Sequence, residues 1–144
     1  MLKPYVCVAC EKVILAKDDI PTLVSLFSKV VVHAIPNAPE IPASAVIPTQ
    51  WAVFSMWDVE PGDELKEYMI CTQMLYPDKS TFGSVARIKL NVEAKKRSQS
   101  VMQFNGFPVG QIGLYTINTW IEENQQKVFG PIEFKIDLEI AQPK

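Results

Sequence analysis

The clearest pattern in this chain is a strict alternation of apolar and charged side chains from residue 132 to residue 140. Successive side chains of a β-strand point to opposite faces, so the alternation predicts a strand with one buried face and one wet face. We therefore expect Phe134 to lie in a core and Lys135 at the surface. The apolar set is Ile132, Phe134, Ile136, Leu138 and Ile140, and the charged set is Glu133, Lys135, Asp137 and Glu139.

The same two-residue period recurs in segments 85–93 and 114–121, and turn residues separate most of the apolar segments. No segment carries a comparable helical period. We predict an all-β fold, an antiparallel two-sheet β-sandwich with Greek-key connections, immunoglobulin-like or jelly-roll-like, of about eight strands. The predicted strands are 4–15, 23–34, 51–58, 65–76, 85–93, 100–105, 114–121 and 132–140.

The longest predicted connection, residues 35–48, contains four prolines at Pro36, Pro39, Pro42 and Pro48. The spacing of three between the first prolines matches the polyproline II repeat. We expect this segment to run extended across one end or flank of the sandwich. The alternative is that it docks into an aromatic groove on a partner.

Length and charge limit the possible classes of protein. The chain has 144 residues, 48% of them hydrophobic, which predicts one domain over residues 1–144. The formal net charge is −2, with no strong basic patch, so we expect no nucleic-acid and no membrane partner. Because Glu11 and Lys12 interrupt the apolar opening segment, it fits neither a signal peptide nor a membrane span, and a cytoplasmic location is expected.

Three cysteines occur, at Cys7, Cys10 and Cys71. The first two form a C-x-x-C motif, but a redox motif of this kind needs a helix N-terminus, and here the segment reads as a strand. We predict buried, reduced thiols that act as small core residues. Redox or metal chemistry is the alternative.

Few residues suggest catalysis. His33 is the only histidine, which disfavours a metal site with several imidazoles, and no Gly-x-Ser-x-Gly elbow is present for a serine nucleophile. We expect His33 to be a surface or hydrogen-bonded structural residue, and we expect no cofactor and no metal. The basic run 95–97 is interpreted as a solvated hairpin tip.

Four carboxylates lie in one predicted loop, at Asp58, Glu60, Asp63 and Glu64. Hard oxygen ligands of this kind could coordinate calcium, although the spacing matches no known calcium loop. Pro61-Gly62 favours the simpler interpretation, a solvated turn.

Several strand and turn motifs in one order are similar to those of a bacterial family of small β-sandwich proteins of unknown function. They are Cys10-Glu11-Lys12-Val13-Ile14, Leu23-Val24-Ser25-Leu26-Phe27, Ile41-Pro42, Trp51-Ala52-Val53-Phe54, Pro61-Gly62, Tyr76-Pro77-Asp78, Asn105-Gly106-Phe107-Pro108 and Gly113-Leu114-Tyr115. Lys79 stands where the family usually has glycine. The resemblance covers most of the chain, implies a sandwich fold and a bacterial or phage source, and carries over no functional residue.

Gly113-x-Tyr115 at the start of a predicted strand resembles the corner tyrosine of immunoglobulin-like domains. That resemblance implies a hydrogen bond from the tyrosine hydroxyl to the backbone a few residues upstream. It concerns architecture rather than activity.

The three tryptophans are the best candidates for a binding role, because Trp serves both as core filler and as a stacking platform. We predict packing for Trp51 and exposure for Trp57 and Trp120. The expected function is a non-enzymatic interaction or structural module of a bacterial or phage protein, binding a protein partner or self-associating through an edge strand. The alternative is a lectin-like domain that binds a carbohydrate or small ligand through Trp57 or Trp120; a hydrolase with an unrecognised carboxylate site is a third.

Overall fold

The computed structural model describes residues 2–15, 20–26, 29–34, 42, 45–122 and 132–140. Strands make up most of these residues. The first sheet contains β1 (Lys3–Leu15), β2 (Pro21–Leu26), β4 (Val46–Asp58) and β7 (Ser98–Pro108), and the second contains β3 (Lys29–Ala34), β5 (Tyr68–Leu75), β6 (Thr81–Leu90), β8 (Gly113–Ile121) and β9 (Ile132–Ile140). A short 3₁₀ turn, η1 (Asp63–Leu65), precedes β5.

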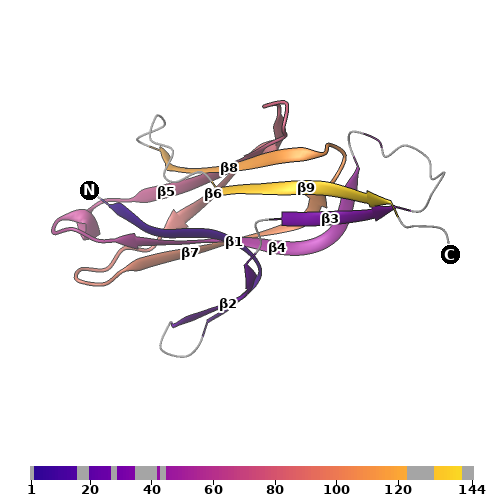
Figure 1. Cartoon of the computed structure of the whole chain (residues 1–144). Helices are drawn as coiled ribbons and strands as arrows, with labels where there is room; N and C mark the ends of the chain where they lie inside the picture. Colours follow the sequence, from indigo (N-terminus) through magenta and orange to yellow (C-terminus); the bar gives the residue numbers. More distant parts are fainter. Residues whose placement is uncertain are drawn as a thin grey trace.

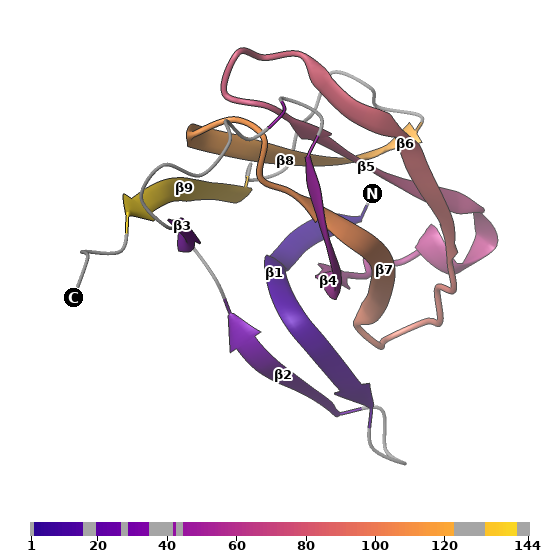
Figure 2. The ribbon, with the colours of Figure 1, turned by 90° about the vertical axis from the view of Figure 1, so that its right-hand side faces the viewer.

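The strand order is β2-β1-β4-β7 in the first sheet and β3-β9-β8-β5-β6 in the second. The two sheets form the layers of a sandwich (Figures 1 and 2). Neighbouring strands are antiparallel, with the exception of the parallel pair β3 and β9. The predicted antiparallel two-sheet sandwich is therefore confirmed, and the parallel pair at one edge is an addition that the sequence did not indicate.

The predicted single strand 23–34 is wrong. It consists of β2 in the first sheet and β3 in the second, so the chain changes sheets between them. Ser25 has a φ of 55°, in the left-handed region, which interrupts the pleat near the end of β2. β4 also begins at Val46, inside the predicted connection, and most of the remaining connection lies outside the described residues.

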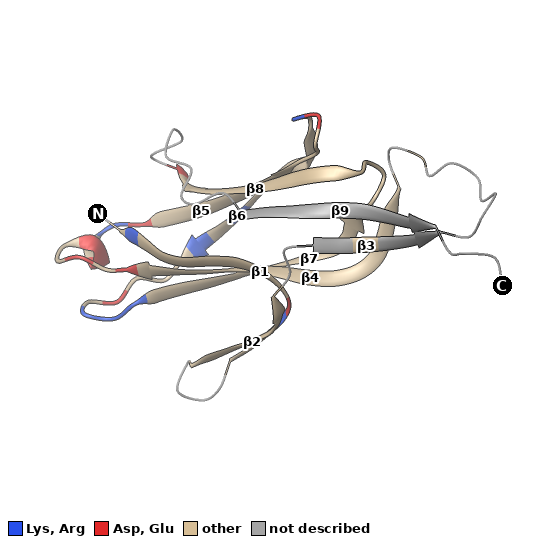
Figure 3. Ribbon diagram, in the orientation of Figure 1, with Lys and Arg blue, Asp and Glu red and all other residues tan. Residues whose placement is uncertain are grey.

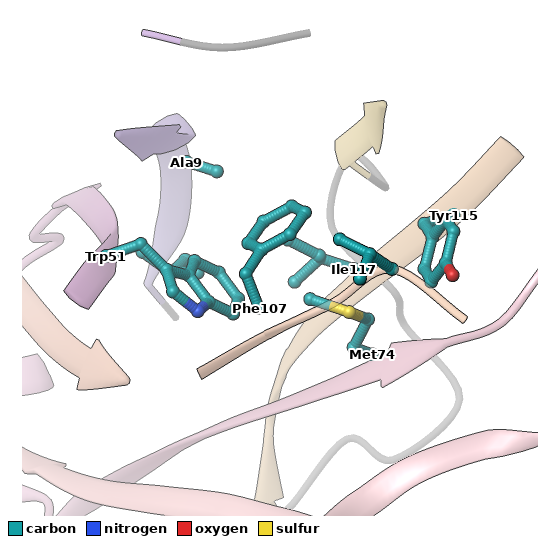
Figure 4. Close-up of a cluster of buried hydrophobic side chains, with 8 residues drawn as sticks. Ala9, Trp51, Met74, Phe107, Tyr115 and Ile117 are labelled. Atoms are coloured by element: carbon teal, nitrogen blue, oxygen red, sulfur yellow. The ribbon is translucent and has the colours of Figure 1, made fainter. Parts of the chain in front are cut away.

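Two clusters of buried side chains fill the space between the sheets. One contains Trp51, Phe107 and Tyr115 (Figure 4), and the other contains Trp57, Tyr68 and Ile121. The alternations of β6 and β8 are confirmed, because their apolar positions are buried or half-buried and face these clusters. The side chains of residues 132–140 lie outside the described part of the structure, so the predicted faces of Phe134 and Lys135 stay predictions.

Tyr115 fixes the turn that leads into β8. Its side chain is buried, and its hydroxyl donates to the carbonyl oxygen of Gln111 at 2.8 Å. The Tyr115 hydroxyl oxygen also accepts from the Gln111 N–H at 3.1 Å. This is the backbone hydrogen bond that the resemblance to a corner tyrosine implied. Burial raises the pKa of Tyr115, so the phenol stays a neutral donor at ordinary pH.

Candidate functional site

Trp51 packs inside the sandwich, as predicted. Only 4% of the residue is exposed, and its indole N–H donates to the carbonyl oxygen of Gly106 at 2.8 Å. Its ring stacks on Phe104 with centroids 4.6 Å apart and meets Phe107 edge-on at 5.4 Å. The indole is therefore a structural element of the core.

The predicted exposure of Trp57 is wrong. The residue is 1% exposed, and its indole N–H donates to the Ser55 hydroxyl at 3.0 Å. Trp57 shares the core-facing parity of β4 with Trp51 and Val53, so it stays buried even at the strand end. The burial of Trp57 therefore follows from the face of the strand on which it lies and not from its position next to a loop.

Trp120 lies on the outer face of the second sheet and is half-buried. Its neighbours Thr119 and Ile121 are buried, which confirms the outward parity of Trp120, and its Cα pairs with that of Cys71 in β5. Trp57 instead faces the core from the other sheet. The structure thus does not bring the two tryptophans together on one surface.

The acidic loop is tied down by internal contacts. Asp58 pairs with Arg97 and Glu60 with Lys3, each at 2.8 Å. Asp63 is only 1% exposed, so the expectation of a solvated turn is wrong for this residue. Among the described residues, no group of three or more His, Cys, Asp or Glu side chains is placed to hold a metal ion.

Asp63 accepts a hydrogen bond from the Tyr68 hydroxyl at 2.8 Å and one from the Glu60 N–H at 2.8 Å. Burial alone would raise the pKa of Asp63, but these hydrogen bonds to the charged form hold it below its ordinary value. The carboxylate therefore acts as a structural acceptor that anchors the loop between β4 and β5.

The cysteines are free thiols. Cys10 and Cys71 are buried and Cys7 is half-buried, in line with the prediction of structural thiols. Burial raises the pKa of each, so they are protonated at neutral pH. Cys7 and Cys10 lie on opposite faces of β1, which does not suit joint chemistry.

The feature that sequence reasoning missed is a split in the first sheet. β1 pairs with β4 up to the match of Cys10 with Ala52, and beyond it residues 11–15 pair with β2 on one side. Residues 46–50 of β4 pair with β7, likewise on one side. We call the two diverging segments, 11–15 and 46–50, the fork, and the hairpin of 11–15 with β2 the arm. Figure 1 shows the arm turning away from the sandwich.

Two grooves lie at the point where the fork opens, and Trp51 borders both. The larger, of about 550 Å³, runs between residues 11–13 and 48–52 and reaches Gln103 and Asn105 of β7. The smaller, of about 260 Å³, lies between Leu26 of the arm and Ile47 of β4. On each side of the fork, one strand edge has no pairing partner among the described residues, and an open strand edge is a template for another strand.

The arm carries exposed apolar side chains on both of its faces. Ile14, Val24 and Leu26 share one face with Lys12, and Val13, Leu15 and Leu23 share the other with Glu11 and Ser25, as their pairing in the hairpin requires. Seven of the eleven large hydrophobic residues that are exposed in the described structure lie on the arm, beside it or on the facing segment of β4. They are Ile14, Leu15, Ile20, Val24, Leu26, Val46 and Ile47.

Charge is distributed in the opposite way. β2, residues 46–50 and residues 103–109 contain no charged side chain, and within 11–15 only Glu11 and Lys12 are charged. Among the residues that Figure 3 colours, the charged positions gather instead at the end of the molecule that carries η1 and the β6–β7 loop, with a smaller group at the β5–β6 turn. Depletion of charge together with exposed aliphatic side chains is typical of the buried centre of a protein interface.

One signal of this surface is visible in the sequence. Val13-Ile14-Leu15 is a continuous apolar run, whereas a strand with one wet face alternates. The run predicts a strand that is covered on both faces. The sequence could not show that the described part of the chain leaves these side chains exposed.

Comparison with known protein families and with curated proteins found no match for the chain.

Proposed function

We propose that this protein is a non-enzymatic β-sandwich whose role is to bind another protein through the arm and the fork. The observation that carries the proposal is the arm, a two-stranded hairpin with apolar side chains on both faces and, beside it, strand edges that have no partner among the described residues. A two-stranded hairpin is at best marginally stable in water and gains stability from a third strand or a packed face. A partner that covers the arm supplies both.

The mode of binding that best fits is strand addition. An extended partner segment pairs its backbone with an open edge of the fork and places alternate side chains into the grooves. Pro48 lacks an N–H and interrupts the β4 edge, so residues 11–15 of β1 offer the more regular edge.

A crosslinking experiment tests the proposal. A photoreactive amino acid at Val24 of the full chain, in cells that naturally express it, is expected to form a discrete adduct with a polypeptide. The same amino acid at Leu65, which is 85% exposed on η1, serves as the control and is expected to form none. Absence of any adduct specific to Val24 would contradict a protein-binding role for the arm.

A lectin-like or small-ligand role is the second candidate. It is supported by the side chains that line the larger groove, because Thr49, Gln50, Gln103 and Asn105 offer hydroxyl and amide groups of the kind that bind sugars. It is weakened by Trp51, whose ring is already stacked on Phe104 and is not open to a ligand. Trp120 is half-buried on the outer face of the second sheet, whereas this groove is lined by strands of the first sheet. It therefore stays a separate candidate.

Binding to a glycan array separates the two candidates. If the protein is an interaction module, no glycan signal of the wild-type chain should depend on the groove. The double variant Gln50→Ala/Asn105→Ala should therefore give the same array result as the wild type. A glycan signal lost in that variant, or in Trp120→Ala, would favour the lectin-like account.

We also propose that the sandwich is immunoglobulin-like. The order β1-β4-β7 corresponds to strands A-B-E, and β9-β8-β5-β6 corresponds to G-F-C-C′, with Tyr115 as the corner tyrosine near the start of F.

The buried free thiols support a reducing, cytoplasmic compartment. Membership of the bacterial family suggested by the sequence motifs remains part of this proposal. Within the described ranges, no helix is long and apolar enough to cross a bilayer.

A further inference from the structure

We propose that the partner of the arm is a second copy of this chain, and that two copies interlock by placing each arm in the fork of the other. The inference rests on the proposed protein-binding function and names its partner. It follows from three properties of the described surface, which are the strand edges without a described partner, the apolar side chains on both faces, and the small number of charged residues on the strands that would meet.

The first argument concerns complementary edges. The fork offers strand edges of about five residues each, at 11–15 and 46–50, and β2 is a six-residue strand whose outer edge has no described partner. One chain thus carries both an acceptor and a donor of matching length. A symmetric dimer satisfies both at once, since each contact in a two-fold interface occurs twice. A foreign strand in the fork would leave the outer edge of β2 open.

The second argument concerns the two apolar faces. An arm that enters a fork lies between the two diverging segments of the partner and pairs with them through its edges. Val24 and Leu26 on one face, and Leu15 and Leu23 on the other, then gain cross-strand neighbours from the partner on both faces. Binding on a flat surface would cover one face and leave the other in water.

The third argument concerns charge. An arm buried in this way must carry few ions, because an unpaired charge in an apolar interface is costly. Residues 13–15, β2 and residues 46–50 contain none, whereas the remote end of the sandwich is rich in both signs. The other charged residues between 11 and 26, Lys17, Asp18 and Asp19, belong to the connection between the two strands of the arm, outside the described residues. Glu11 and Lys12 are adjacent and of opposite sign, at the mouth of the groove, where a two-fold arrangement can pair them between copies.

Sedimentation equilibrium of the purified full chain tests the inference. The wild type is expected to form a dimer as its concentration is raised, and Val24→Lys/Leu26→Lys is expected to weaken the dimer at least about a hundredfold because it places two charges in the interface. Leu65→Lys/Ile112→Lys, at two positions that are exposed outside the arm, is the matched control and should leave the dimer intact. A wild type that stays monomeric throughout, or a dimer that survives the arm variant, would overturn the inference.

A second measurement guards against an arm that is unfolded by the lysines. Chains carrying Val24→Cys are mixed with chains of different length carrying Thr49→Cys, and a short thiol-to-thiol crosslinker is added. A mixed dimer is expected from this pair and not from Val24→Cys with Leu65→Cys. If the first pair gives no mixed dimer, the interlocked arrangement is wrong, whatever the sedimentation result.

The outcomes also separate this inference from the function on which it rests. A monomeric wild type that is crosslinked from Val24 to a different polypeptide removes the self-pairing and keeps the protein-binding role. A monomer without any adduct from Val24 removes both.

Discussion

Asp63 illustrates how a loop is fixed by a single carboxylate. Tyr68→Phe deletes the hydroxyl that donates to it, so we predict a loss of about 1 to 3 kcal/mol in the free energy of unfolding at pH 7. The folded-state pKa of Asp63 lies below the ordinary value of 3.8, so the charged form stabilises the fold above that pH. This contribution is lost as the pH falls through the folded pKa, and the effect of the substitution should shrink there. Urea unfolding at neutral and strongly acidic pH checks this, and an equal loss at both would contradict the assignment.

Tyr115 makes a second residue-scale prediction. Tyr115→Phe leaves the ring in place but removes the hydroxyl partner of both backbone groups of Gln111, and we expect it to cost about 1 to 3 kcal/mol. Tyr5→Phe is the control, because Tyr5 is half exposed and its ring still packs under Arg97 without the hydroxyl. The control should change stability by less than about 0.5 kcal/mol. Equal effects in thermal melts would count against the corner role.

The tryptophans separate by burial. Trp57→Ala opens a cavity in the core and should cost about 3 to 5 kcal/mol, while Trp120→Ala, on the outer face, should cost clearly less. Unfolding curves of the two variants make the comparison. A larger loss for Trp120 would show that the outer face of the second sheet is covered.

At the scale of elements, the two-residue period was a reliable guide where one face is wet. It placed the strands now seen as β6, β8 and β9, and the parity of Trp120, because alternation is enforced by one core and one solvent face. It failed where that condition does not hold. Segment 23–34 contains no Pro, Gly, Asn or Asp, so no turn residue marked the change of sheet after Leu26. The prediction also missed the arm, since a strand with apolar residues on both faces has no two-residue period.

The arm yields an element-scale prediction about local stability. Two strands without a third have few buried contacts, so in dilute solution the amides of β2 should exchange faster than those of the central strand β4. Hydrogen exchange followed by mass spectrometry measures both segments in the same sample. Comparable protection of β2 and of residues 52–57 in the monomer would contradict a marginally stable arm.

At the scale of the whole molecule, the sandwich and the interaction surface differ in how far the sequence specifies them. The class of fold follows from many short-range patterns that agree with one another. The fork instead depends on where β1 leaves β4, which is a matter of long-range pairing, and its one local signal is the apolar run 13–15. Tryptophan is a residue type with a known binding chemistry, so the sequence pointed to Trp57 and Trp120. The exposed surface of the arm and the fork instead consists of aliphatic residues, and only their position in the fold gives them a role.

The most direct test of the account is hydrogen exchange of the arm and the fork as a function of protein concentration. If two copies interlock, protection of residues 11–15, 20–26 and 46–50 should rise together as the wild-type concentration is increased, because each open edge gains a strand. Protection of the same segments should not rise with concentration in Val24→Lys/Leu26→Lys, while the β5–β8 pairing keeps its protection in both proteins. Exchange in the three segments that does not change with concentration in the wild type would contradict the interlocked dimer.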